Sequence, residues 1–340
     1  MRVLVLILAG CGTSVIGGSA ADAPLLDGPA TVADAPVVRS DGRTSLPDAA
    51  SARPDGASGA PDARLAGPDA GVVSPCPSPP ASASASVLAA YARVSSVRQT
   101  AGVGCATLIE ALDTSAAAHC AYYAANVGDN ACVGDAHREV SGCAQFYAAS
   151  FSAREVKAGY MGSPAFEVMA FGAVGERAVD VWVDSVWHRT PVLSPWVRDL
   201  GYGDTTGCAT IDFGVGAPAS GSIIATWPAD GQTGVPVSFD GSREGPEPPP
   251  PDPSAMDHGW PSGYPITSFT RSQLTEHALS RDGDPTPIAG HFFGHDDPAA
   301  QGLLDSAYVL YADEPLAAGT TYHVHVGGPG GSIDFSFTTR

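Results

Sequence analysis

The chain has 340 residues and a formal charge of -19, from 17 basic and 36 acidic residues. This balance, with no run of Lys or Arg to neutralise a row of phosphates, argues against nucleic-acid binding. Gly (40) and Pro (30) are abundant. Most of their excess lies in two stretches, which leaves roughly 250 residues of ordinary globular composition, enough for two domains of ~100–200 residues.

The N-terminus has the order of an export signal. Residues 3–8 are all apolar, and Leu8-Ala9-Gly10-Cys11 follows them, as in a signal peptide that ends in small residues. This tetrapeptide resembles a bacterial lipobox, which implies that residues 1–10 are removed and that Cys11 is acylated. Acyl chains hold a protein on a membrane. We therefore expect a lipid-anchored cell-envelope protein, in the outer membrane, or a secreted one; a buried strand that ends in Cys is the alternative.

Residues 21–75 contain a repeat with a period of seven. Prolines in successive units and the lack of an apolar seam exclude a coiled coil. Low hydrophobicity with scattered charge predicts disorder, and Pro-rich segments act as extended spacers. We therefore expect residues 11–85 to form a disordered tether between the lipid and the folded part. The repeated residues, each followed by Gly or Ala, are Asp27, Asp34, Asp41, Asp48, Asp55, Asp62 and Asp69.

Of the seven cysteines, Cys11 stands apart from the other six. An even number, with no CxxC pair in the sequence, favours three disulfides over a zinc ribbon or a redox motif. Disulfides in turn indicate an oxidising compartment. The spacing leaves the pairing open among Cys76, Cys105, Cys120, Cys132, Cys143 and Cys208.

The region from residue 86 to 218 alternates helical and strand patterns. Apolar residues recur at helical spacing over Val87–Val97 and Thr107–Asn126, and a third helical pattern covers Glu176–Val186. Cys208–Phe213 alternates like a half-buried strand. Helices that flank a short sheet predict an α+β fold.

A set of short motifs follows in order along the same region. They are Ala118-His-Cys-Ala-Tyr-Tyr123 with Asn126, His137-Arg-Glu139, Arg154, Gly159-Tyr160, Phe166-Glu-Val168, Val179-Asp-Val-Trp-Val-Asp-Ser185, His188-Arg189, Leu193, Pro195 and Leu200-Gly-Tyr-Gly203. The succession resembles the bacterial branch of the CAP superfamily (cysteine-rich secretory, SCP-like proteins). The resemblance implies an α-β-α sandwich over residues 86–218.

In CAP proteins two His and two Glu converge on the floor of a cleft, and several members bind a divalent metal there. The resemblance assigns His137, Glu167 and His188 to this cleft, with zinc or a similar cation as the expected metal, which imidazole and carboxylate suit. Animal and plant relatives place a Glu shortly before the second His, where this chain has Ser185. Glu139 is the candidate replacement, because H-x-E on an extended segment puts both side chains on one face.

Two further residues of this region have competing interpretations. His119 lies on the inner face of a predicted helix, where we expect a hydrogen-bonded core residue. Ser185 and His188 have the spacing of a nucleophile and its base, but nothing marks an oxyanion hole or an orienting carboxylate. We expect no catalytic pair there.

The leading functional hypothesis is a non-enzymatic module that binds a lipid, glycan or peptide in the cleft. The second is a metal-assisted hydrolase of the peptidase kind, in which Glu167 or Glu139 acts as general base beside a cation held by His137 and His188. The third is a purely structural role. Family membership alone does not fix the activity.

Residues 219–340 have the alternation and turn spacing of a β-sandwich. Three motifs, Pro228-Ala-Asp-Gly-Gln-Thr-Gly-Val235, Pro315-Leu-Ala-Ala-Gly-Thr-Thr-Tyr322 and Phe335-Ser-Phe-Thr-Thr339, resemble bacterial Ig-like domains of the SbsA type, which implies an adhesive or spacer module. The run Pro246–Pro253 predicts an exposed polyproline-like loop.

Two histidine pairs in this region could bind metal. His291 and His295 are four residues apart, and His323 and His325 share one face of a predicted strand. We favour a solvated loop and an exposed sheet face, because no helical periodicity fixes the first pair.

Overall fold

A four-stranded sheet forms the centre of the helix-containing part of the chain. The computed structural model describes residues 76–216, 225–300 and 302–340; the expected signal peptide, Cys11 and residues 11–75 of the expected tether lie outside them. The sheet has the order β1-β3-β4-β2. β1 pairs parallel with β3, and the other pairings are antiparallel. The strands are β1 (Thr107–Leu108), β2 (Ser163–Phe171), β3 (Val197–Thr205) and β4 (Cys208–Val215).

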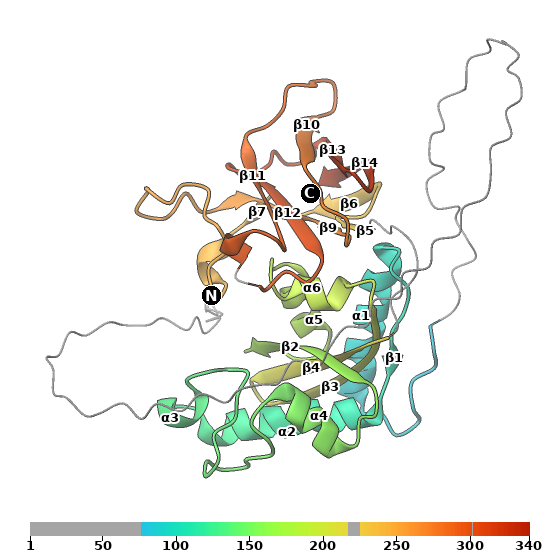
Figure 1. Ribbon diagram of the computed structural model, residues 1–340, viewed down its shortest axis with the longest axis vertical. Coiled ribbons are helices and arrows are strands. Elements are labelled where there is room, and N and C mark those ends of the chain that lie inside the picture. Colours follow the sequence, from blue (N-terminus) through green and yellow to red (C-terminus); the bar gives the residue numbers. More distant parts are fainter. Residues whose placement is uncertain (1–75, 217–224, 301) are drawn as a thin grey trace, which may run out of the picture. The chain divides into compact units, whose positions relative to one another are not determined.

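Helices cover both faces of this sheet. In Figure 1 the sheet lies between α2 and α4 on one side and α5 and α6 on the other, in agreement with the contacts that α2 makes with β3 and β4. The chain is therefore mixed α and β, as expected. The helices are α1 (Ala85–Thr100), α2 (Glu110–Asn126), α3 (Asn130–Val133), α4 (Phe151–Ala158), α5 (Glu176–Val183) and α6 (Arg189–Leu193).

The predicted helices are present with different ends. The second was expected from Thr107, but Thr107 and Leu108 pair with β3, so the helix begins only at Glu110. The third ends at Val183 instead of Val186. The pairing of a sheet edge is a long-range interaction that helical periodicity does not contain.

Two glycines allow α2 to pack closely on β3. A Cβ at Gly201 would overlap the backbone of Leu112 and Asp113, and one at Gly203 would overlap Ala116 and Ala117. The Gly-Tyr-Gly motif thus has a packing role, since only glycine leaves room for a helix backbone at this distance. The close approach fixes the height of α2, and of His119 upon it, above the sheet.

All six expected cysteines form disulfides, which confirms that prediction. The pairs are Cys76–Cys105, Cys120–Cys208 and Cys132–Cys143. The second joins α2 to the start of β4 across 88 residues of sequence. The first joins Cys76, which lies within the expected tether, to Cys105.

The region after residue 225 contains two four-stranded sheets of order β10-β13-β14-β6 and β11-β12-β9-β5, and a two-stranded pair β7-β8. Buried residues of both larger sheets, such as Phe337 and Phe269, belong to one hydrophobic cluster. The strands are β5 (Ala225–Trp227), β6 (Gln232–Val235), β7 (Ser238–Phe239), β8 (Ser262–Gly263), β9 (Ile266–Phe269), β10 (Glu276–Arg281), β11 (Gly290–Gly294), β12 (Ala307–Ala312), β13 (Thr321–Gly328) and β14 (Gly331–Thr339), with short 3₁₀ turns at Gly241–Arg243 and Pro298–Ala300.

The proline-rich segment differs from the expected exposed loop. Pro248 is buried and several of its neighbours are half-buried. The carbonyl of Pro246 accepts a hydrogen bond from the indole Nε1 of Trp187, at 2.6 Å. The segment therefore packs against the helix-containing part of the chain.

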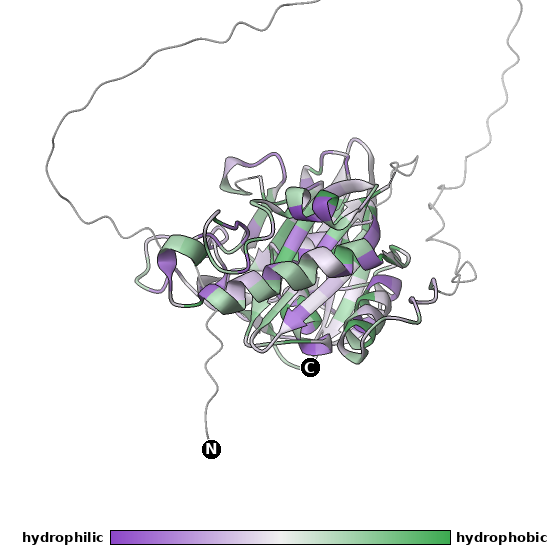
Figure 2. Ribbon diagram, turned by 90° about the horizontal axis from the view of Figure 1, so that it is seen from below, coloured by the Kyte–Doolittle hydropathy of each residue, from purple (hydrophilic) through white to green (hydrophobic). Residues whose placement is uncertain are grey.

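Helices in the described ranges are too short or too polar to cross a membrane. Figure 2 shows helices that carry both green hydrophobic and purple hydrophilic segments. Such mixed helices bury one side and leave the other in water.

Candidate functional site

Helix α2 and the loop that follows it place three ionisable side chains together. His119 lies on the buried face of α2, and residues 127–149 return past it with His137 and Glu139. The Cys132–Cys143 disulfide closes this loop. The hydroxyl of Tyr122, one turn from His119, donates to the carbonyl of Cys132 and accepts from the amide of Val140. These local bonds hold the loop against the helix.

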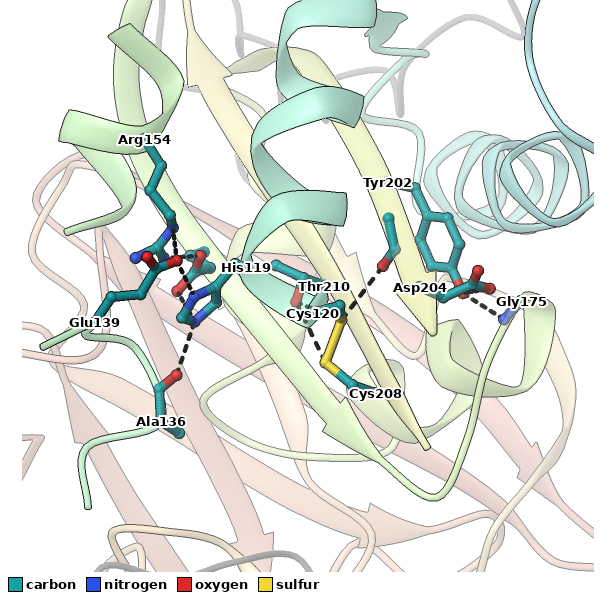
Figure 3. The surroundings of a disulfide bond; sticks show 12 residues. His119, Cys120, Ala136, Glu139, Arg154, Gly175, Tyr202, Asp204, Cys208 and Thr210 are labelled. Carbon is teal, nitrogen blue, oxygen red and sulfur yellow. Dashed lines mark hydrogen bonds and ion pairs between the residues drawn. A yellow bond between two sulfur atoms is a disulfide. The ribbon is translucent and has the colours of Figure 1, made fainter. Parts of the chain in front are cut away.

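His119 is completely buried and both of its ring nitrogens have partners. Nδ1 lies 3.0 Å from Oε1 of Glu139, and Nε2 lies 2.8 Å from the carbonyl oxygen of Ala136. Figure 3 shows the ring between these two acceptors, next to the Cys120–Cys208 disulfide. The expectation of a hydrogen-bonded core histidine agrees with this geometry.

The hydrogen bonds of His119 and Glu139 link them as a pair. A carbonyl oxygen only accepts, so Nε2 of His119 carries a proton. Oε2 of Glu139 accepts the backbone N–H groups of Tyr147 and Ala148, at 2.6 and 3.2 Å. One proton lies between Nδ1 of His119 and Oε1 of Glu139, and the two groups share it.

Glu167, on β2, is the second carboxylate of the cluster. Its Oε1 accepts from Nδ1 of His137 at 2.9 Å, and its Oε2 accepts from Nη2 of Arg154, on α4. Nε2 of His119 lies 3.7 Å from Oε1 of Glu167. Arg154 and the two histidines therefore partner both buried glutamates, and buried ionisable groups are retained only when they are paired in this way.

The charges around Glu167 determine its ionisation. Burial raises its pKa, but the hydrogen bond from His137 and the positive charges of His119 and Arg154 outweigh burial and hold the pKa well below its usual range. Glu167 is thus a carboxylate at neutral pH.

Two acids beside Glu167 behave in the opposite way. Burial and the negative charge of Glu167 raise the pKa of Glu155 to about 8, against the lowering effect of Arg154. The same two causes raise the pKa of Asp212 well above its usual range, and the nearby Ser115 hydroxyl offsets this only in part. Neither acid has a hydrogen-bond partner of normal geometry. Glu155 is therefore mostly protonated at pH 7, and the environment of Asp212 favours its protonated form.

His188 belongs to a different set of contacts. Its Nδ1 lies 3.2 Å from Oε1 of Glu244 and 3.3 Å from Oγ of Ser185. Glu244 comes from the region after residue 225 and also accepts the backbone amides of Val186 and Trp187, at 2.9 and 2.6 Å. The expected meeting of His188 with His137 and Glu167 is not found, because this carboxylate binds His188 and the turn that carries it.

Ser185 stabilises the same turn. Its hydroxyl donates to the carbonyl of Trp182 at 3.0 Å and accepts the amide of His188 at 3.2 Å. Glu244 does supply a carboxylate next to His188, but it lies at Nδ1, the same ring nitrogen that Ser185 faces. In a catalytic triad the serine and the acid meet opposite nitrogens of the ring. The arrangement is a hydrogen-bonded turn.

In the described ranges, no three His, Cys, Asp or Glu side chains are arranged to hold a metal ion. His137 and Glu167 lie together as expected, but His137 is tied to Glu167 through Nδ1, and His188 is elsewhere. Glu139, expected near the rim, is instead buried, 3% exposed, because it is the counter-ion of His119.

Sequence reasoning missed four members of these clusters: Arg154 as a site residue, Glu155, Asp212 and Glu244. Arg154 was visible within the motif series. Asp212 lies at a polar position of the alternating strand pattern, which predicts an exposed side chain, whereas the structure buries it completely. Nothing in the sequence around Glu244 indicates a partner 56 residues away.

No protein-family model and no curated protein matches the chain. Among solved structures it is similar to an extracellular protein containing a SCP domain from Bacillus anthracis strain Ames. That match has 17% sequence identity and a TM-score of 0.33, and covers 38% of this chain and 40% of the other. The chain thus spans about two fifths of the length of that protein.

Proposed function

We propose that residues 76–216 form an SCP-like module that works outside the cytoplasm and binds a glycan or a peptide against His137. One observation carries this proposal. The side chain of His137 is 44% exposed, whereas its partner Glu167 is 1% exposed. A half-exposed ring that is held from below by a buried carboxylate is ordered before the ligand arrives, which lowers the entropy cost of binding.

The hydrogen bonds of His137 define the ligand that would suit it. Glu167 is ionised and accepts from Nδ1 of His137, so in the neutral form of the ring the proton is on Nδ1 and Nε2 is a hydrogen-bond acceptor. A ligand must then offer an O–H or N–H group. Sugar hydroxyls and peptide amides do so, whereas lipid acyl chains do not, so glycans and peptides are favoured over a lipid.

The hydrolase hypothesis receives less support from the geometry. A general base needs a free lone pair within reach of the substrate proton. Both oxygens of Glu167 are engaged, by His137 and Arg154. Both oxygens of Glu139 are engaged as well. A divalent ion at His137 would bind Nε2, with Glu167 behind it as a supporting carboxylate.

Binding is tested on the full chain with His137→Asn. The Asn amide can still donate to Glu167 but lacks the outer nitrogen. N-acetylglucosamine oligomers, tripeptides and phosphatidylcholine vesicles serve as probes. We expect a saccharide or peptide to bind at least ten times more weakly to the variant, with the melting temperature unchanged. The control is His258→Asn, another histidine paired with a glutamate. Equal binding by both variants and wild type, or binding of vesicles alone, would overturn the proposal.

A second test needs no ligand. Long-range ¹⁵N NMR of the histidine rings, assigned with His137→Asn, reports which nitrogen carries the proton. We expect His137 to hold it on Nδ1 at pH 7.5, with Nε2 unprotonated. A proton on Nε2 would remove the acceptor and contradict the proposed recognition.

We also propose that the chain is held at the cell envelope through Cys11. The disulfides support an oxidising compartment, and the lipobox-like sequence supports acylation. Fractionation of cells that express Cys11→Ser tests the anchor, and we expect the variant in the soluble fraction. Membrane association at the wild-type level would refute it.

A further inference from the structure

An aromatic pair lies one helical turn beyond His119. Tyr123, on α2, and Phe171, at the end of β2, have ring centroids 4.4 Å apart and ring planes tilted by 32°. Both side chains are half-buried. Tilted aromatic pairs stabilise each other, so the two rings form a preformed apolar surface that still reaches the solvent.

The alternation of β2 places this pair in line with the ionic cluster. Glu167, Met169 and Phe171 are two residues apart, so they share one face of the strand. Glu167 lies beside His119 and Phe171 contacts Tyr123, both on α2. The face of β2 that meets α2 therefore changes from ionised to aromatic over a length of about 13 Å, at ~3.3 Å per residue.

Ala136 connects the aromatic pair to His137. It packs on the same buried cluster as Tyr123 and Phe171. Its carbonyl oxygen lies 2.8 Å from Nε2 of His119 (Figure 3), which fixes this stretch of the loop. His137 follows directly in the chain, so its half-exposed ring is held near the aromatic pair.

The polar groups of this surface can both donate and accept hydrogen bonds. Nε2 of His137 is an acceptor. Burial raises the pKa of Tyr123, and its hydroxyl has no hydrogen-bond partner in the described parts of the chain, so it is a donor for a ligand. The exposed carboxylate of Asp135 accepts the amide of His137 on Oδ1, at 3.0 Å, and its second oxygen can accept from a ligand.

We propose, on the basis of the proposed function, that Tyr123 and Phe171 stack against one ring of an oligosaccharide whose neighbouring ring donates a hydroxyl to His137. A sugar ring has a face of C–H groups that fits an aromatic surface, and each sugar hydroxyl both donates and accepts. A peptide N–H only donates and a peptide carbonyl only accepts. Aromatic rings beside a separate donor and acceptor therefore favour a glycan over a peptide.

Calorimetric titration of the full chain with the trimer of N-acetylglucosamine tests the aromatic site. Tyr123→Leu and Phe171→Leu keep apolar bulk but remove a ring, and each should weaken binding about tenfold. Tyr123→Phe keeps the ring and loses only the hydroxyl, and should weaken binding about fivefold. The single sugar should bind more weakly than the trimer, because it cannot reach both the aromatic pair and His137.

Phe292→Leu is the matched control. Phe292 is also half-buried and stacks on a histidine, His277, with ring centroids 4.3 Å apart, but it lies after residue 225. This variant should bind the trimer as wild type does. Saturation-transfer NMR on wild type provides a readout that does not depend on a folded variant, and irradiation of the aromatic protons should transfer to the sugar ring protons.

The results distinguish this site from the proposed role of His137. Trimer binding that His137→Asn weakens but the leucine variants do not would overturn the aromatic site and keep the proposed function. Binding of a tripeptide alone, weakened by His137→Asn, would do the same. Trimer binding that only the leucine variants weaken would keep the aromatic site and overturn the role of His137. Binding of neither probe at millimolar concentration would overturn both.

Discussion

The two parts of the chain keep polar groups in their interiors by different means. Before residue 217, the buried side chains include charged residues such as His119, Glu139 and Arg154, and three disulfides hold the surrounding segments. After residue 225, the buried polar residues are Ser and Thr with one exception, Glu244, among those the structure describes. The carboxylate of Glu244 accepts hydrogen bonds from the backbone amides of Val186 and Trp187, which belong to the first part.

This difference indicates which part of the chain holds a buried cluster of ionisable side chains. Buried charge is costly and persists only with paired partners, so the first part holds a site whose outer member is His137. The second part has a conventional apolar core, and its paired histidines His258, His291 and His323 are partly exposed. Substitutions that act on one part alone can test this difference between the two parts.

Removal of the Cys120–Cys208 disulfide should have the largest effect. The bond closes the longest loop of the three, 88 residues, and Cys120 is adjacent to His119. Cys120→Ala with Cys208→Ala should reduce the free energy of unfolding by about 4.6 kcal/mol in the chain-entropy model. Urea denaturation measures the loss, and hydrogen exchange should show it in residues 76–216. Equal loss of protection in β12 and β13 would argue against two separately stabilised parts.

Glu244→Ala should have the next largest effect. The change leaves two buried backbone amides and His188 without their acceptor, at a cost of about 2–3 kcal/mol. Because Glu244 joins the two parts, we expect their urea transitions to lie further apart in the variant than in wild type. Glu314→Ala, an exposed acid in the same part, is the control. One transition with an unchanged midpoint would show that Glu244 does not couple them.

Glu155→Gln should change how stability depends on pH. The pKa of Glu155 is about 8 in the folded chain and 4.5 in the reference state. At a pH between these two values the unfolded chain has released a proton that the folded chain keeps. The contribution of Glu155 to the stability of the folded chain is therefore full below pH 4.5 and is lost as the pH rises to about 8. The pH dependence that Glu167 produces has the opposite sign. Because the pKa of Glu167 is lowered in the folded chain, its contribution to stability is lost as the pH falls.

Glutamine does not ionise, so the variant should not lose stability at this site as the pH rises. We expect it to be more stable than wild type at pH 8 and nearly equal at pH 4, as measured by urea midpoints across this range. Glu314→Gln should leave the pH profile unchanged. A wild-type profile in Glu155→Gln would mean that Glu155 is ionised in the folded chain.

Arg93→Ala should have the smallest effect. Arg93 on α1 pairs with Asp180 on α5 at 2.7 Å, but the two side chains are 39% and 48% exposed. Exposed ion pairs contribute about 0–1 kcal/mol and are screened by salt. Thermal melts at low and high ionic strength should show a small difference that salt removes. A larger loss of stability that salt does not remove would indicate that Arg93 stabilises the contact between α1 and α5 by packing as well as by its charge.

Local patterns in the sequence determined much of the chain. Helical spacing located α1, α2 and α5, alternation located β4, β13 and β14, and an even set of six cysteines predicted three disulfides. These features depend on neighbours within a few residues, or on a count. His137 and Glu167 were also paired correctly through the motif order, although no spacing rule brings residues 30 apart together.

Only the tertiary structure decided which histidines share a site. His119 joins His137 because α2 packs on β3 at Gly201 and Gly203, and Arg154 then reaches Glu167 from α4. His188 is separated from them because Glu244, in a loop of the other part, binds its Nδ1. The pairing of α2 with β3, and of Glu244 with the turn before α6, are long-range contacts. Their energy depends on burial and on partners that are distant in sequence, which is why no local pattern could reveal them.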